Sequence, residues 1–436
     1  MKKGITGMLA ILFVLLSTAA VFGQAAQQKV ELLWWAYPRF STTGKDPGVY
    51  EQELVDRYGK LNPNVTIKIE TLSYNGGPAK VNVAIASNTV PDLIDDDPVR
   101  LIADYATRGA LVPMDDVIDR SKVLDAFVPD STLDGKFYMY PMSALPICIG
   151  VDKTIFQQAG ALGLLPLAKS DRSWTYDDLT KALDAVKNVK GVYPTALWAG
   201  NEQADVGMRM VLQTFGAKLF APDNKRLTLN DAAGVKGMEW LVGLKQKGLI
   251  APGAEAMLAS DAIDLFHQGR VALSMQYDSS QLLPLRIAQK AGKAANFDVV
   301  LLPYPSAPGA SSGTSLALTG VAVFKTADQA KIDAAKQFAK WLCNAEDIVL
   351  SSIGTVPAIK GMRTYGQTHN DPEVAFVDTW GGTHNIYAGK VTKGWAEVRT
   401  KWYPNFQAAL TGVKTPKQAL DDFVAAANEV LKKYYP

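Results

Sequence analysis

Strand-length apolar runs alternate with amphipathic, helix-length segments along most of the chain. Residues 30–36 (VELLWWA) form a continuous apolar run, which is typical of a strand covered on both faces, and residues 49–61 have the pattern of a helix. Alternating apolar residues over 65–69 and an apolar run over 90–94 indicate two further strands, with a helix over 79–87 between them. This order of elements predicts β-α-β units, and therefore an α/β fold with mainly parallel sheets.

The second half of the chain continues the alternation. Strands are expected over 271–276, 297–302 and 316–324, and the intervening residues 303–315 are rich in Pro, Gly and Ser, which indicates a loop or a crossing between domains. A length of 436 residues exceeds what one ordinary core supports and suggests two domains.

The first 23 residues have the layout of a secretory signal peptide. Lys2 and Lys3 precede an apolar run over residues 8–16, and small residues lead to a plausible cleavage point after Gly23. The apolar run is shorter than the roughly 20 residues that a membrane span needs. No cysteine stands near the cleavage point, so a lipid cannot be attached there through a thiol. We expect residues 1–23 to be removed and the mature protein to be soluble in the periplasm or otherwise outside the cytoplasm.

Charge and the reactive residue types exclude several functional classes. The 45 Lys and Arg residues balance 43 Asp and Glu residues, which leaves a net charge of +2 and no footprint for nucleic acid or an anionic membrane. The three histidines are scattered, so neither a zinc site nor a cofactor is expected. Cys148 and Cys343 could form a disulfide outside the cytoplasm, although their apolar contexts favour two separate buried thiols.

Catalytic motifs are almost absent. The chain has no GxGxxG fingerprint, no phosphate-binding loop and no HExxH pair. One GxSxG match over 309–313 offers Ser311 as a nucleophile, but that motif needs a strand before it and a helix after it, and here the order is reversed. Two carboxylates of a glycosidase leave no sequence signature, because their arrangement is spatial. We expect a protein that is not an enzyme, with a secreted esterase or glycosidase as the alternative.

Aromatic and acidic residues stand where the predicted elements end. Trp198, Trp380 and Trp395 follow or flank such ends, and an apolar ring face beside hydrogen-bonding groups is typical of a ligand pocket. The acidic run 95–97 follows the strand predicted at 90–94, which is where α/β proteins place ligand contacts. The same run is equally well explained as a solvated loop or a helix cap.

Eight short motifs occur in a fixed order over almost the whole mature chain, and together they carry a family resemblance. The motifs are LLWWAY (32–37), VPDLI (90–94), GALVP (109–113), DGKFYMYP (134–141), SWTYDDL (173–179), FHQGRVALSMQ (266–276), LPYPSAPG (302–309) and GTVPA (354–358). In these motifs the chain resembles the extracellular solute-binding proteins of bacterial ABC importers, in the cluster that includes maltose-binding protein. Their order and spacing are specific for the family and much less specific for the ligand.

The resemblance implies a two-lobed periplasmic-binding-protein fold of type II, in which each lobe is a mainly parallel sheet flanked by helices and hinge strands join the lobes. Lobe I would comprise residues 27–144 and 313–358, and lobe II residues 145–312 and 359–436. A small solute would bind between the lobes, which close over it by hinge motion. The closed monomer would then dock on membrane permease subunits. A receptor-like sensor with the same fold is a further alternative.

The resemblance also implies a set of cleft residues. Aromatic stacking combined with carboxylate and amide hydrogen bonds suits a sugar or an oligosaccharide, while an arginine leaves a phosphorylated or carboxylated solute open. At one of the positions the family often has a glycine and an aromatic residue, and this chain lacks the glycine. The implied ligand-binding residues are Tyr37, Arg39, Asp96, Asp97, Trp198, Asn201, Glu202, Tyr277, Asp278, Trp380 and Trp395.

Overall fold

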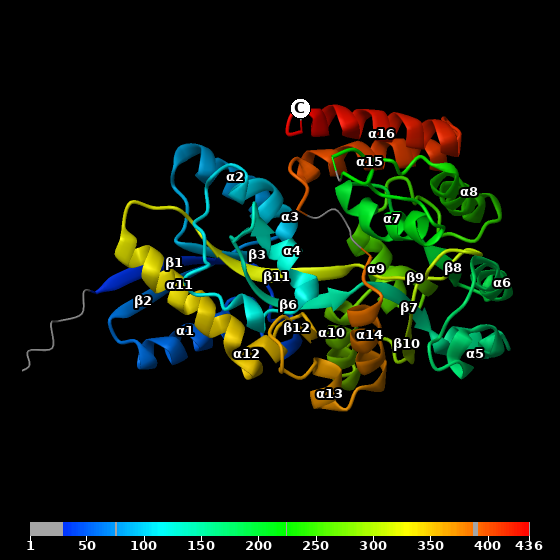
Figure 1. Cartoon of the computed structure of the whole chain (residues 1–436). Coiled ribbons are helices and arrows are strands. Elements are labelled where there is room, and N and C mark those ends of the chain that lie inside the picture. The colour runs from blue at the N-terminus through cyan, green and yellow to red at the C-terminus, as the bar shows by residue number, and fades with distance from the viewer. Residues whose placement is uncertain (1–28, 75, 224, 387–390, 436) are drawn as a thin grey trace, which may run out of the picture.

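The computed structural model describes residues 29–74, 76–223, 225–386 and 391–435. The predicted signal peptide, residues 1–23, lies outside these ranges. Two sheets lie side by side with helices on their faces, and the long strands β6 and β11 run through the middle of the molecule (Figure 1). None of the helices in the described ranges is both long and apolar enough to cross a membrane.

The larger sheet has the strand order β12-β6-β11-β3-β1-β2. Strands β1, β2 and β3 pair in parallel, whereas β11 is antiparallel to both of its neighbours and β12 is antiparallel to β6. Its strands are β1 (Val30–Ala36), β2 (Val65–Thr71), β3 (Leu93–Asp96), β6 (Tyr140–Pro146), β11 (Leu316–Val323) and β12 (Val356–Pro357).

The smaller sheet has the order β10-β7-β9-β8, and only β8 and β9 pair in parallel. Its strands are β7 (Cys148–Asp152), β8 (Tyr193–Ala196), β9 (Val271–Tyr277) and β10 (Val299–Leu302). A separate two-stranded hairpin joins β4 (Thr132–Leu133) to β5 (Lys136–Phe137).

The predicted α/β class is confirmed. The expectation that each sheet is mainly parallel is wrong, because most neighbouring strands in both sheets pair antiparallel. The β-α-β alternation produces parallel neighbours only where consecutive strands are joined by a helix on one side, as for β1, β2 and β3. β6, β11 and β12 join the larger sheet from distant parts of the chain and run in the opposite sense to their partners. Apolar patterning identifies a strand, and it carries no information about the direction of a partner.

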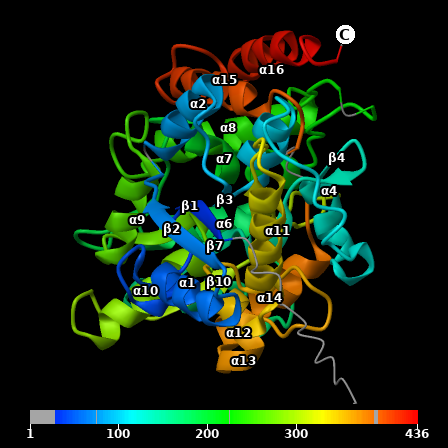
Figure 2. The ribbon, with the colours of Figure 1, turned by 90° about the vertical axis from the view of Figure 1, so that its left-hand side faces the viewer.

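Helices cover both sheets. In Figure 2, α1 and α11 lie beside the strands β1 and β2 of the larger sheet, and α11 contacts β1, β6 and β11. The longer helices are α1 (Val49–Leu61), α2 (Gly77–Ser87), α6 (Tyr176–Val186), α7 (Asp205–Thr214), α8 (Ala232–Gln246), α9 (Ala259–His267), α10 (Ser279–Lys290), α11 (Gln329–Asn344), α14 (Pro372–Thr383), α15 (Trp395–Leu410) and α16 (Pro416–Lys432). Shorter ones are α3 (Pro98–Arg100), α4 (Val128–Ser131), α5 (Lys153–Gln158), α12 (Glu346–Leu350) and α13 (Tyr365–His369).

Each sheet has its own apolar core. Trp34 and Phe338 pack edge to face at 5.4 Å between ring centroids in the core of the larger sheet, while Leu273 and Trp198 belong to the core of the smaller one. The two cysteines are free and buried, Cys148 in the smaller sheet's core and Cys343 in the larger sheet's core. These positions agree with the prediction that the two cysteines are separate buried thiols.

The chain passes between the two sheets at a few short connections. β6 ends at Pro146 and β7 begins at Cys148, so that Ile147 alone links the sheets there. The amide of Ile147 donates to the carbonyl of Ser315, which lies in the segment that leads from β10 back to β11. Two connections between the sheets are therefore tied together at one point.

Candidate functional site

Three consecutive aspartates and two arginines form a buried charged cluster at the end of β3. The strand ends at Asp96, and Asp97 begins the next turn as the N-cap of α3. The sequence pattern predicts that this strand ends two residues earlier, at Ile94, because a run of acidic residues is typical of a loop. Arg39 and Arg100 neutralise the carboxylates, so the strand continues its pairing with β11 as far as Asp96.

Asp96 lies at the centre of this cluster, and its side chain is fully buried. Its carboxylate accepts hydrogen bonds from Nη2 of Arg39 at 3.0 Å, from Nε and Nη2 of Arg100 at 2.6 Å each, and from the amide of Asp97 at 2.9 Å. A buried charge is tolerated only when it is paired and hydrogen-bonded in this way. Protein donors therefore occupy both oxygens of Asp96, so its role is to hold the two arginines in place.

Asp95 occupies the least compensated position in the cluster. Its Oδ1 accepts a hydrogen bond from Nε1 of Trp34 at 3.0 Å, and its Oδ2 lies 3.5 Å from Nε of Arg39. Burial raises the pKa of Asp95 to about 7, although the charge of Arg39 opposes the shift. Tyr37 stacks on Tyr74 beside it, with 5.2 Å between ring centroids, and the Arg39 guanidinium lies 5.5 Å from the Tyr74 ring centroid.

We predict that Asp95→Asn removes one component of the pH dependence of stability. Folded Asp95 keeps its proton up to about pH 7, whereas an unfolded aspartate loses it near the ordinary value of 3.8, so the free energy of unfolding falls as pH rises between these values. The slope from one such group is about 1.4 kcal/mol per pH unit. Denaturant unfolding of wild type and variant at several pH values between 4 and 7 measures it.

The difference between the two proteins is the informative quantity in this experiment. Burial also raises the pKa values of Asp152 and Asp378, each to about 6, but both groups titrate alike in wild type and variant. Asp95→Asn should therefore gain stability relative to wild type as the pH rises. Unfolding free energies that stay parallel from pH 4 to pH 7 would contradict the assignment.

Helices α15 and α7 supply the opposite wall of the site. α15 begins directly after Gly394, which has a φ of +81° and whose added Cβ would lie 2.5 Å from the Tyr434 ring. Trp395 and Arg399 are four residues apart on α15 and share one face of the helix. Nη2 and Nε of Arg399 donate to the carboxylate of Asp205, the first residue of α7, at 2.8 and 3.1 Å.

A cavity of 140 Å³, which we call the central cavity, separates the two walls. The Arg209 guanidinium lies 5.3 Å from the centroid of the Trp395 ring. The ring provides a flat apolar surface, and charged groups from both halves of the molecule surround it. The lining residues are Asp97, Pro98, Val99, Ile147, Asp205, Val206, Arg209, Ser315, Ala317, Leu318, Trp395 and Arg399.

Electrostatic interaction links the two walls across the central cavity. Burial by itself would raise the pKa of Asp97, but the charges of Arg100, Arg39 and Arg399 together outweigh it and hold the pKa of Asp97 below its ordinary value. Arg399 belongs to the α15 wall and Asp97 to the β3 wall. Opposite charges from the two walls therefore meet around the cavity.

The structure brings several of the predicted residues together at this place. Asp97 and Trp395 line the central cavity. Tyr37, Arg39 and Asp96 lie in the charged cluster behind Asp97, where both Arg39 and Arg100 have their guanidinium groups 5.7 Å from the Tyr37 ring centroid.

Two more of the predicted residues lie at the edge of the α7 wall. Asn201 caps the short helical turn Glu202–Ala204 that leads into α7, with its Oδ1 accepting from the amide of Gln203 at 3.1 Å. The carbonyl of Glu202 accepts from Nη2 of Arg399 at 3.3 Å, while its side chain is exposed. These residues shape the backbone next to the cavity.

The remaining predicted residues are distributed elsewhere. Trp198 is 1% exposed and packs in the core of the smaller sheet. Tyr277 is buried, with its hydroxyl 2.9 Å from Nε2 of His267, and Asp278 is the N-cap of α10. Trp380 stacks on His384 with 4.7 Å between ring centroids. None of these four predicted residues is among the lining residues of the central cavity.

Sequence reasoning missed four charged residues of this site. Arg100, Asp205, Arg209 and Arg399 appear in the sequence as ordinary surface charges on helices. A signal exists for one of them, because Arg399 stands four residues after Trp395, which places the pair on one helical face. The Asp205 to Arg399 pairing joins residues 194 positions apart, and only the fold reveals it.

The structure also bears on the hydrolase alternative. Ser311 lies in the loop between β10 and β11 with no helix after it, so it lacks the strand-turn-helix setting of a nucleophile elbow. Within the described ranges, no group of three or more His, Cys, Asp or Glu side chains is arranged to hold a metal ion.

Comparisons with known proteins give a consistent result. Residues 53–376 match the model of a family described as bacterial extracellular solute-binding protein. A protein of Brucella abortus (strain 2308) that is named as a binding protein is 22% identical over 395 residues, which cover 88% of this chain and 90% of that protein.

Solved structures of solute-binding proteins share the fold. A solute-binding protein of Thermotoga lettingae, bound with α-D-tagatose, superposes with a TM-score of 0.78 at 17% identity over 92% of this chain and 99% of that chain. An ABC substrate-binding protein of Listeria monocytogenes, in complex with cycloalternan, superposes with a TM-score of 0.74 at 20% identity over 92% and 99% of the two chains. The predicted two-lobed fold is thereby confirmed.

Proposed function

The chain belongs to the family of bacterial extracellular solute-binding proteins, and we propose that its solute is a saccharide that it delivers to an ABC importer. The observation that carries this proposal is the central cavity, in which one buried tryptophan face is surrounded by charged groups from both lobes. An apolar ring face packs against the C–H face of a sugar ring, and carboxylates and guanidinium groups hydrogen-bond its hydroxyls. The sugar-bound relatives in Thermotoga and Listeria support the same class of ligand.

The charge balance of the central cavity favours a neutral ligand. Asp97 and Asp205 contribute two negative charges, and Arg209 and Arg399 contribute two positive charges. A phosphorylated or carboxylated solute would leave an uncompensated charge in a site with little access to water, which costs free energy. Arg39 is held by Asp95 and Asp96 behind the cavity, so it does not supply a free cation for an anionic solute.

Ligand entry requires the lobes to separate. The central cavity measures 140 Å³, whereas small-molecule sites commonly measure about 300–1,000 Å³. We propose that lobe I consists of residues 27–144 and 313–358, that lobe II consists of residues 145–312 and 359–436, and that the connections at Ile147 and Ser315 act as the hinge. A few connecting residues are sufficient to absorb the backbone rotation of such a closure.

The cellular setting of the proposal follows from the family. The family is extracellular by its description, and we propose that residues 1–23 are the export signal. The closed, liganded protein would dock as a monomer on the permease subunits of an ABC importer. Binding in this scheme is reversible and involves no catalysis, metal or cofactor.

Trp395→Ala tests the proposed site. The indole is 3% exposed and forms one wall of the central cavity, so its removal should weaken binding of a saccharide at least about 10-fold, which corresponds to about 1.4 kcal/mol. Calorimetric titration with a library of mono- and oligosaccharides measures the dissociation constant. Trp341→Ala is the matched control, because that tryptophan packs on Tyr58 at the outer face of lobe I. Wild-type protein that binds no member of the library would overturn the saccharide proposal.

A further inference from the structure

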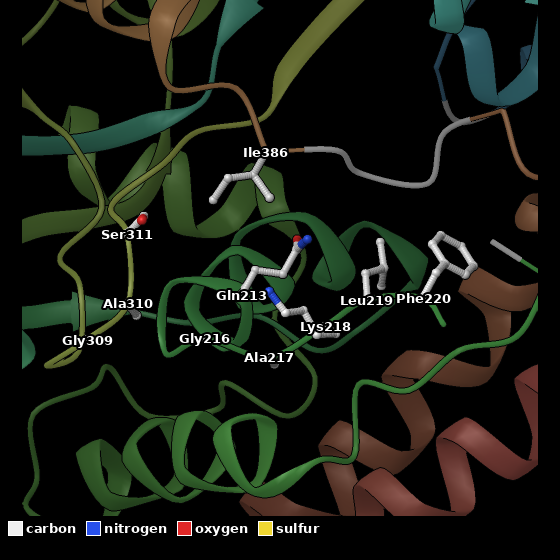
Figure 3. Close-up of a pocket in the computed structure, with 10 residues that line it drawn as sticks. All are labelled: Gln213, Gly216, Ala217, Lys218, Leu219, Phe220, Gly309, Ala310, Ser311 and Ile386. Carbon is white, nitrogen blue, oxygen red and sulfur yellow. The ribbon is translucent and has the colours of Figure 1, made fainter. Parts of the chain in front are cut away.

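A second cavity, which we call the side cavity, lies in lobe II next to the central one. It measures 420 Å³ and is lined at its two ends by Phe220 and Ser311, with Gln213, Lys218 and Ile386 between them. In Figure 3 the Gln213 amide and the Ile386 side chain point toward one another across this space, with Phe220 and Ser311 on opposite sides. None of the predicted ligand-binding residues lines this cavity.

The wall of the side cavity is held together by backbone hydrogen bonds. The amide of Ala307 donates to the carbonyl of Thr214 at 3.1 Å, which fixes the loop after β10 to the end of α7. The amide of Thr314 donates to the carbonyl of His384 at 2.9 Å, and the amide of Ile386 donates to the carbonyl of Thr314 at 2.6 Å. These hydrogen bonds join three separate parts of the chain around one space, so the fold itself sets the shape of the side cavity.

Helix α7 contributes to both cavities. Asp205 and Arg209 line the central cavity, and Gln213 lines the side cavity. The three residues are spaced by four, so they form one stripe along the helix, with a rise of about 6 Å between successive members. A ligand lying along this stripe would meet a polar side chain at every turn.

Two other elements connect the cavities in the same way. Phe220 of the side cavity and Trp395 of the central cavity are neighbours, with 5.9 Å between ring centroids. The segment between β10 and β11 contributes Ser311 to the side cavity and Ser315 to the central one. A helix, an aromatic pair and a loop therefore border both spaces.

We infer that the two cavities form one extended site, so that the ligand is an oligosaccharide whose first ring lies against Trp395 and whose next rings lie in the side cavity. This inference rests on the proposed saccharide function. The side cavity offers what further rings require, namely apolar surfaces at Phe220 and Ile386 and hydrogen-bonding groups at Gln213, Lys218 and Ser311. No carboxylate lines it, so it selects hydroxylated rings and excludes cationic amino sugars.

The test compares saccharides of increasing length in wild type and in two variants. The probes are malto-, cello- and xylo-oligosaccharides of one to four rings, and the quantity is the ratio of three-ring to one-ring affinity measured by calorimetry. We expect a ratio of at least about 10 in wild type for the series that binds. Ala310→Trp, which fills the side cavity, and Lys218→Ala, which removes its cation, should each lower the ratio toward 1.

Controls separate this inference from the proposed function. Lys187→Ala removes an exposed lysine of lobe II that pairs with Asp184, and it should keep the wild-type ratio. Trp395→Ala should weaken one-ring and three-ring binding alike and leave the ratio high. A wild-type ratio near 1, or a ratio unchanged in Ala310→Trp, would overturn the extended site while the single-ring site stands. Absence of binding by every probe would overturn both.

Discussion

Asp96→Ala is expected to lower the free energy of unfolding by about 3–5 kcal/mol, because it breaks a buried ion-pair network by removing its central member. The substitution leaves the guanidinium groups of Arg39 and Arg100 without the carboxylate that accepts three of their hydrogen bonds. It also removes the acceptor for the amide of Asp97. Chemical denaturation followed by tryptophan fluorescence measures the loss.

The matched control for this experiment is Asp125→Ala. Asp125 also forms an ion pair, with Lys360 at 3.0 Å, but its side chain is 93% exposed, so its loss should cost at most about 1 kcal/mol. Asp96→Asn should lie between the two variants, since an amide keeps the volume and part of the hydrogen bonding. If Asp96→Ala proved as stable as Asp125→Ala, the charged cluster would contribute nothing to the stability of lobe I.

Arg399→Ala is expected to raise the dissociation constant for the saccharide at least about 100-fold, which corresponds to about 2.7 kcal/mol. The guanidinium lines the central cavity, orients Asp205 through two hydrogen bonds and attracts Asp97 across the cavity. Its removal takes away a ligand donor, leaves Asp205 misplaced and weakens closure at the same time. Calorimetric titration with a saccharide that binds the wild type measures the effect.

Arg399→Lys refines this experiment, because lysine keeps the charge and loses the two-pronged geometry. Its dissociation constant should fall between those of wild type and Arg399→Ala. Arg363→Ala is the control, since Arg363 is an exposed arginine that pairs with Glu346 away from the cavity. A change of less than about threefold in Arg399→Ala would show that the guanidinium takes no part in binding.

The sequence was a good guide to local elements and a weaker guide to the site. The strand predicted at residues 30–36 and the helix predicted at 49–61 are confirmed, because the apolar pattern of each element is set by the face that it buries. The ends of elements were harder, as at β3, where long-range pairing with two arginines keeps acidic residues within a strand. The predicted set of ligand-binding residues and the bounds of the lobes stay predictions.

Tryptophans illustrate the same limit. Trp198 and Trp395 both stand where predicted elements end, and the sequence gives no means of separating them. In the structure Trp198 lies in the core of the smaller sheet, while Trp395 faces a cavity beside Arg209. Gly394, with a φ of +81°, turns the backbone immediately before Trp395, where α15 begins.

The sequence by itself determined the α/β class, the order of the elements and the family, since all three are recorded in local patterns and ordered motifs. The tertiary structure alone decided the sense of strand pairing, the burial of the aspartates at the end of β3 and the meeting of Asp205 with Arg399. The physical reason is distance along the chain. Periodicity along the sequence indicates which face of a single helix or strand is buried. A binding site is made by side chains that stand up to hundreds of positions apart, and only the folded lobes bring them together.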